Sequence, residues 1–171
     1  MFDDTQTDAS IRSLVNARNE VFWLDDPGRP AALPPLETHA TADLCVVGAG
    51  FSGLWTAVLA KEEHPDWSVV VLEGTRIAGG ATGRNGGFCS ASLTHGLANG
   101  LSRWPTEIST LLRIGNQNLD SIEDFINEHG IECEFIRSGD LALAVEPYQL
   151  KGIQEAAAAG RALGIDYQLL T

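Results

Sequence analysis

The sequence feature that most restricts the fold is the run "ADLCVVGAGFSGLWTAVLAKE" at residues 42–62, in which 17 successive residues carry no charge. Three of its glycines form a G-x-G-x-x-G pattern. A helix of this length could just cross the hydrocarbon core of a bilayer. The interior of the run argues against a membrane span, because glycines and hydroxyl side chains separate a β-type run at 44–47 from a helix-forming run at 54–60. The sequence therefore predicts a strand and a helix joined by a glycine turn.

A second β-type run, "SVVVLE" at 68–73, follows the helix that we expect over 52–63. Neither β-type run alternates apolar and polar residues, which is typical of strands that are buried on both faces in a parallel sheet. The predicted fold class is α/β, built on a Rossmann-like βαβ unit of the kind that binds FAD or NAD(P). We expect an N-terminal strap, further helices and a hairpin to be added to this unit.

Residues 1–42 are predicted to form the strap. Ser10 is placed to cap a short amphipathic helix, and four prolines follow in "DDPGRPAALPPLETHATA". Each proline lacks a hydrogen-bond donor and biases the residue before it away from helix, so this part should take an extended path over the surface.

The chain beyond residue 100 is predicted to be mainly helical. Helical spacing of apolar residues indicates a long helix over 108–126 that ends at Gly130, and a further helix over 147–163. β-type runs on both sides of residues 138–140 indicate the hairpin, and the chain ends in another β-type run, "IDYQLLT".

Composition restricts the partners and the compartment. The net charge of −12, from 23 acidic and 11 basic residues, repels nucleic-acid phosphates and anionic lipids, so we expect neither nucleic acid nor membrane as a partner. The three cysteines include no C-x-x-C pair, and His39, His64 and His129 are too scattered for a metal site. Together with the lack of a signal-peptide pattern, this predicts a cytoplasmic protein without a metal. Cys89 is expected to be a packing residue rather than a redox thiol.

The spacing of the glycines in the first run suits a dinucleotide. Gly48 allows a tight turn out of the strand, Gly50 lets the main chain approach a pyrophosphate, and Gly53 permits close packing of the helix on the sheet. The helix N-terminus then points free N–H groups at the anion. Glu73 lies twenty residues beyond Gly53, where a ribose diol is held in such folds. The alternative interpretation is a packing turn with a chance glutamate.

A second glycine-rich segment, "GGATGRNGG" at residues 79–87, helps to choose the ligand. The carboxylate of Glu73 would repel the 2′-phosphate of NADP, and Arg76 is the only nearby residue that could reopen that option, so FAD and NAD remain. A nicotinamide enzyme would normally continue from the second strand into another helical crossover. Small residues instead let main chain lie against a flat ring or a second phosphate, so the segment favours FAD.

These stretches resemble the FAD-dependent amino-acid and amine oxidases of the D-amino-acid oxidase superfamily, which includes glycine, sarcosine and γ-glutamylputrescine oxidases. The resemblance rests on "DLCVVGAGFSGL" and "VVVLEGTRIAGGATGRNGG", and the lead-in "FWLDDPGRPAALPPL" is similar to the γ-glutamylputrescine oxidase branch. It implies an FAD cofactor and a small-molecule amine or amino-acid substrate. The cofactor-binding residues expected from the motif and from the resemblance are Gly48, Ala49, Gly50, Phe51, Ser52, Gly53, Glu73, Gly74, Thr75, Gly80, Ala81, Thr82, Arg84, Asn85, Gly86, Gly87 and Phe88.

The chain also departs from that family. Members are more than twice as long, so residues 43–171 are expected to be the N-terminal part of an FAD-binding oxidoreductase domain that is incomplete relative to the family. No catalytic residue can be carried over, and the isolated chain is expected to be inactive. His95 does not match the histidine that binds flavin covalently in some relatives. Two alternatives stay open: a non-catalytic nucleotide-binding fragment and an NAD-dependent dehydrogenase.

Overall fold

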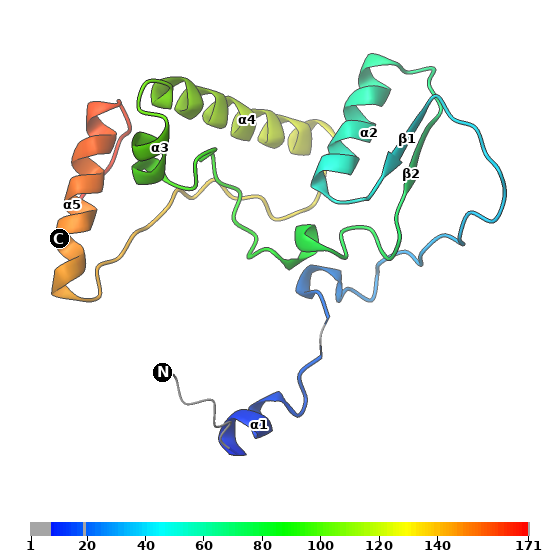
Figure 1. The fold of residues 1–171 in the computed structure, drawn as a ribbon, viewed down its shortest axis with the longest axis horizontal. Coiled ribbons are helices and arrows are strands. Elements are labelled where there is room, and N and C mark those ends of the chain that lie inside the picture. The colour runs from blue at the N-terminus through cyan, green and yellow to red at the C-terminus, as the bar shows by residue number, and fades with distance from the viewer. Residues whose placement is uncertain (1–7, 19, 171) are drawn as a thin grey trace. The chain divides into compact units, whose positions relative to one another are not determined.

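The structure is a computed structural model that describes residues 8–18 and 20–170. It divides into two compact units, residues 1–87 and 88–171. Each unit is described by itself, and Figure 1 labels the elements. The first unit holds α1 (Asp8–Leu14), the 3-10 turn η1 (Phe22–Leu24), β1 (Leu44–Val47), α2 (Phe51–Glu63), β2 (Val69–Leu72) and the 3-10 turn η2 (Ala81–Arg84). The second holds α3 (Leu97–Arg103), α4 (Ile108–Glu128) and α5 (Pro147–Ala162).

A βαβ unit organises residues 44–72, and it confirms the α/β prediction at this level. Strands β1 and β2 pair in parallel, with a register that runs from Leu44 opposite Val69 to Val47 opposite Leu72. Helix α2 connects the strands and lies alongside them (Figure 1). The predicted strand bounds are reproduced within a residue, and α2 begins one residue before the predicted start.

The strands are less buried than predicted. Val46 is buried, but Val47 is 84% exposed, and all four residues of β2 are only half-buried. The expectation of burial on both faces is therefore wrong for the described residues. The physical reason is that two strands and one crossover helix cannot cover both faces of a sheet.

The strap is extended and largely exposed, as predicted, but its helix begins earlier than expected. Helix α1 starts at Asp8, so Ser10 lies inside the helix instead of capping it. An acidic residue in the first turn is favourable because it faces the positive end of the helix dipole. Between η1 and β1 the structure describes turns and extended chain, with neither helix nor strand.

Both long helices of the second unit are confirmed. Helix α4 runs over Ile108–Glu128, and Gly130 follows it with φ +59°. Helix α5 begins at Pro147 and is capped by Gln149, whose Oε1 accepts hydrogen bonds from the N–H groups of residues 145 and 146 at 2.8 and 3.0 Å. Proline suits the first turn because its missing N–H would have no partner there.

The predicted hairpin is wrong. Described residues 131–146 contain no strand. Arg137 instead forms ion pairs with Asp120 at 2.5 Å and Glu123 at 3.3 Å, which tie this stretch to α4. An isolated two-stranded hairpin is marginal in water, so contacts with a neighbouring helix decide the path. The run at residues 165–170 forms no strand either.

Two further expectations need correction. The eight glycines of residues 74–100 predict a specialised loop region without helix or strand, but helix α3 begins at Leu97. Gly100 lies inside this helix because Thr94 and Ile108 approach it closely, which leaves no room for a side chain. Cys89 is exposed, not packed, as are the other two cysteines.

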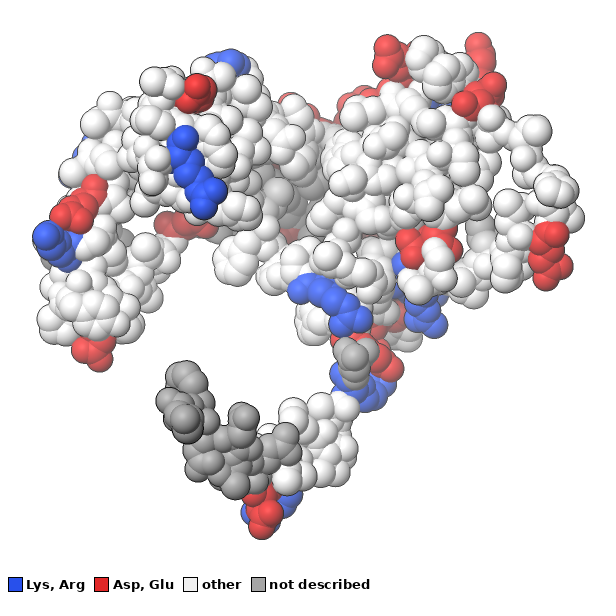
Figure 2. All heavy atoms as spheres, in the orientation of Figure 1, with Lys and Arg blue, Asp and Glu red and all other residues white. Residues whose placement is uncertain are grey.

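Basic side chains are dispersed on the surface that Figure 2 shows. On this face Lys and Arg side chains lie in small separate groups and not in a continuous basic area.

No helix in the described part of the chain is both long and apolar enough to cross a bilayer. Residues 8–18 and 20–170 hold no group of three or more His, Cys, Asp or Glu side chains suited to a metal ion.

Two glycines in helices test the packing of the second unit. A Cβ at Gly115 in α4 would clash with the carbonyl oxygen of Ala91, whereas a Cβ at Gly152 in α5 would meet open space. We expect Gly115→Ala to lower the free energy of unfolding by about 1 to 3 kcal/mol, since backbone must move. Gly152→Ala should raise it by up to about 1 kcal/mol through helix propensity. Thermal unfolding of both variants measures this, and equal shifts of the same sign would contradict the packing.

Candidate cofactor site

The turn after β1 adopts the geometry that its glycines predict. Gly48 has φ +101°, which favours glycine, and its N–H donates to the carbonyl of Leu72 at 2.7 Å. A Cβ at Gly53 would clash with the carbonyl of Gly48 and come within 3.2 Å of Val46. Gly53 therefore lets the first turn of α2 lie directly against the end of the strand, as expected.

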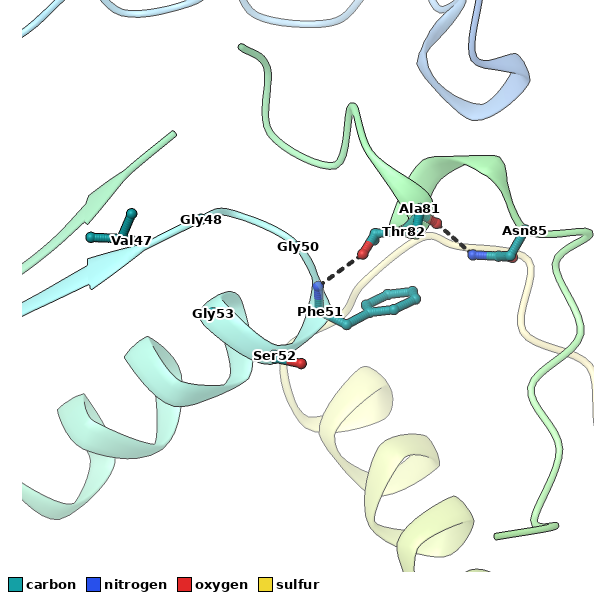
Figure 3. Close-up of a pocket in the computed structure, with 9 residues that line it drawn as sticks. All are labelled: Val47, Gly48, Gly50, Phe51, Ser52, Gly53, Ala81, Thr82 and Asn85. Atoms are coloured by element: carbon teal, nitrogen blue, oxygen red, sulfur yellow. Dashed lines mark hydrogen bonds between the residues drawn. The ribbon is translucent and has the colours of Figure 1, made fainter. Parts of the chain in front are cut away.

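The N-terminus of α2 presents three main-chain donors. The N–H of Leu54 is the first that bonds to a carbonyl of the helix, that of Gly50 at 2.9 Å. The N–H groups of residues 51–53 therefore point out of the helix end, where the helix dipole is positive. Phe51 N–H donates to Thr82 Oγ1 at 3.0 Å (Figure 3). A hydroxyl oxygen from the second glycine-rich segment thus takes one of these donors.

Asn85 fixes the second glycine-rich segment beside the helix end. Its side-chain N–H donates to the carbonyl of Thr82 at 2.5 Å, and its Oδ1 accepts from Gly87 N–H at 2.7 Å. Figure 3 shows Asn85 and Thr82 on the same side of the turn as Phe51. The side chain of Asn85 therefore holds the segment in a compact turn.

An open pocket of about 490 Å³ lies between this segment and the turn after β1. It is lined by Val47, Gly48, Gly50, Phe51, Ser52, Gly53, Ala81, Thr82 and Asn85. A Cβ at Gly50 would lie 2.9 Å from Thr82 Oγ1, so a side chain at this position would close the gap between the two glycine-rich segments. The pocket size is within the range of small-molecule sites in proteins.

Glu73 joins the ends of both strands. One carboxylate oxygen accepts the N–H of Ala49 at 2.9 Å, and the other accepts the N–H and the hydroxyl of Thr75 at 2.9 and 3.0 Å. The N–H of Ala49, followed by the donors of Thr75, lowers the pKa of Glu73 below its ordinary value of 4.5. Glu73 stays exposed to solvent although its carboxylate accepts these three hydrogen bonds.

The predicted cofactor-binding residues differ in whether they line the pocket. Eight line the pocket: Gly48, Gly50, Phe51, Ser52, Gly53, Ala81, Thr82 and Asn85. Ala49 is fully buried beneath the turn, and Thr75 contacts Glu73. The structure does not bring the others to the pocket lining: Glu73, Gly74, Thr75, Gly80, Arg84, Gly86, Gly87 and Phe88. Phe88 is 89% exposed and begins the second unit.

Sequence reasoning missed Val47 as a lining residue. It is the last residue of β1 and lies directly before Gly48, at the carboxyl end of a parallel strand. Ligands of open α/β sheets bind at this edge, and that rule could have identified it.

The residues present fit a dinucleotide. The helix end offers several N–H groups to an anion, the glycines leave the space that a pyrophosphate needs, and a carboxylate lies at the end of the second strand. Fold and site together form a βαβ unit whose glycine turn and carboxylate are of the kind that suits a dinucleotide.

Comparison with known proteins gives the family. The family described as "FAD dependent oxidoreductase" (DAO) matches residues 43–171, and the chain belongs to it. FAD is the cofactor of this family, which decides against the NAD alternative.

Two relatives are similar over most of this chain. "Gamma-glutamylputrescine oxidoreductase" of Escherichia coli is 33% identical over 137 residues, which cover 78% of this chain and 31% of that protein. "Probable oxidoreductase OrdL" of Haemophilus influenzae is 29% identical over 139 residues, with the same two shares. The chain therefore spans about a third of the length of these curated relatives. No solved structure matches it.

The hydrogen bonds to Glu73 predict a pH-dependent stability. A carboxylate whose pKa is lowered by folding stabilises the folded state above its unfolded pKa, and this contribution is lost as the pH falls through the folded pKa. We therefore expect the Tm of the parent to exceed that of Glu73→Gln at neutral pH. The difference should shrink as the pH is lowered below 4.5. Calorimetry of both proteins across this range measures it.

Glu62→Gln is the matched control, since Glu62 is an exposed carboxylate on α2 in the same unit. Its Tm difference from the parent should be smaller at neutral pH. A Tm difference for Glu73→Gln that stays constant between about pH 3 and about pH 7 would contradict the role of the carboxylate.

Proposed function

We propose that this chain is the FAD-binding N-terminal part of a cytoplasmic oxidoreductase that oxidises the C–N bond of an amine or amino acid. The observation that carries the proposal is the pocket at the N-terminus of α2, where the first glycine turn and the second glycine-rich segment meet. Membership of the FAD-dependent family supports the cofactor. The amine substrate is supported by the γ-glutamylputrescine oxidoreductase at 33% identity.

In this proposal the described residues bind the cofactor and do not react. The outward N–H groups of residues 51–53 bind the pyrophosphate, and Glu73 accepts hydrogen bonds from the ribose hydroxyls. Thr82 and Asn85 lie beside the pyrophosphate, and the stretch from Gly80 to Phe88, with Gly74 and Thr75 at its approach, leads toward the flavin. When bound, FAD takes up the two electrons and the hydrogen that the substrate loses.

The remaining two thirds of the relatives' length has no counterpart in this chain. Residues that enclose the flavin and position the substrate are proposed to lie in a corresponding part of the whole protein, so no catalytic residue is assigned here. The substrate is a small molecule, and the acidic charge of the chain disfavours nucleic acid and anionic membranes as partners.

The first test is whether the full-length protein purifies with FAD and how Gly50→Val changes its affinity. A branched side chain at Gly50 would fill the gap to Thr82 and block the pyrophosphate, so we expect FAD to bind about 10-fold to 100-fold more weakly. Gly152→Val is the control, because a Cβ at Gly152 in α5 meets open space and Gly152 is not among the proposed cofactor-binding residues. The absorption spectrum detects bound flavin, and fluorescence quenching gives the dissociation constants.

Equal FAD affinities of Gly50→Val and the parent would contradict the proposed position of the pyrophosphate. A colourless parent that releases no flavin on denaturation would overturn the proposed function as a whole.

The second test concerns residues 1–171 expressed alone. Val47 and the residues of β2 are exposed or half-buried, and ordering glycine-rich loops costs more conformational entropy than ordering other loops. We therefore expect weak flavin binding and no amine-dependent peroxide release. The full-length protein under the same conditions is the control. Sub-micromolar FAD affinity together with turnover by residues 1–171 would contradict this expectation.

A further inference from the structure

The strap contacts the second glycine-rich segment at η1. The indole N–H of Trp23 donates to the carbonyl of Asn85 at 2.8 Å, across 62 positions of sequence. Further along the strap, Arg29 Nη2 donates to the carbonyl of Ile77 at 2.6 Å. Two hydrogen bonds therefore connect the strap to residues 77–85, which include most of this segment and the residues directly before it.

Two glycines of the segment provide the space for these contacts. A Cβ at Gly83 would clash with the carbonyl oxygen of Ala78 and lie 2.8 Å from a methyl carbon of Val21, and a Cβ at Gly87 would lie 2.8 Å from the indole ring of Trp23. Val21 is buried, with 9% of its surface exposed. The sequence suggested that these glycines make room for a cofactor, but at both positions a strap side chain lies close to the glycine.

Asn85 connects the strap to the cofactor site. Its carbonyl accepts the Trp23 N–H, and its side chain holds the carbonyl of Thr82. The hydroxyl of Thr82 in turn accepts the N–H of Phe51 at the end of α2. A continuous series of contacts therefore runs from the strap to the pocket, although Trp23 does not line that pocket.

We propose that Trp23, supported by Val21, is a positioning residue for the cofactor. It holds residues 81–87 in the conformation that brings Thr82 and Asn85 to the N-terminus of α2. This inference rests on the proposed function, because the cofactor whose site is positioned is FAD. Without the strap contacts the glycines of the segment would have many accessible conformations, and binding would have to order them.

The test compares Trp23→Phe with Trp67→Phe in the full-length protein. Trp23→Phe keeps an aromatic ring but removes the N–H that binds Asn85. Trp67 belongs to the same unit and stacks on His64 at 3.9 Å, so Trp67→Phe makes the same chemical change away from the segment. Two quantities are measured: amide hydrogen exchange of residues 81–87 in the flavin-free protein, and the FAD dissociation constant.

The loss of one hydrogen bond should change both quantities about fivefold. We expect Trp23→Phe to exchange faster at residues 81–87 and to bind FAD more weakly, while Trp67→Phe matches the parent in both. Trp23→Ala should have a larger effect on both quantities. If Trp23→Ala fails to fold, the result for the conservative Trp23→Phe alone tests the proposal.

Other results overturn the proposal. If Trp23→Phe equals Trp67→Phe in both quantities, the strap does not order the segment. If exchange becomes faster but FAD affinity is unchanged, the strap orders the segment without positioning the cofactor. A parent that holds no FAD overturns the proposed function and this inference with it, whereas a parent that binds FAD normally but is insensitive at Trp23 overturns this inference alone.

Discussion

The site depends on how Ala49 is fixed between the two strand ends. Its N–H donates to the carboxylate of Glu73 at the end of β2, and its carbonyl accepts the N–H of Ala78 at 3.0 Å. Ala49 is fully buried, so its N–H and its carbonyl, which form these two bonds, are shielded from water. Ala49 thereby joins the turn after β1, the end of β2 and Ala78, the residue directly before the second glycine-rich segment.

Once these turns are joined, the end of α2 offers main-chain N–H groups to the proposed pyrophosphate, and none of the residues that line the described pocket is basic. The N–H groups of residues 51–53 point outward, and the helix dipole adds positive potential. Thr82 already places a hydroxyl oxygen on the Phe51 N–H. In a chain with net charge −12, main-chain donors of this kind would let the proposed site bind a negatively charged dinucleotide.

The sequence predicted the parts of the fold that depend on local chemistry. The spacing of Gly48 and Gly53 identified the strand, the turn and the helix, because only glycine tolerates the φ at position 48 and the contact at position 53. The predicted hairpin failed because Arg137 pairs with α4, a contact that no local pattern contains. The bond from Trp23 to Asn85 was missed for the same reason, since 62 positions separate the two residues. Most of the pocket lining was predicted, whereas its connection to the strap was not.

A crystal structure of the full-length protein with FAD would show whether the end of α2 binds the pyrophosphate. We expect pyrophosphate oxygens to lie about 2.7 to 3.2 Å from the N–H groups of residues 51–53, with Gly50 facing the phosphates. We also expect that Asn85 still accepts the Trp23 N–H. A pyrophosphate bound elsewhere, with the end of α2 left to Thr82 and solvent, would contradict the first expectation.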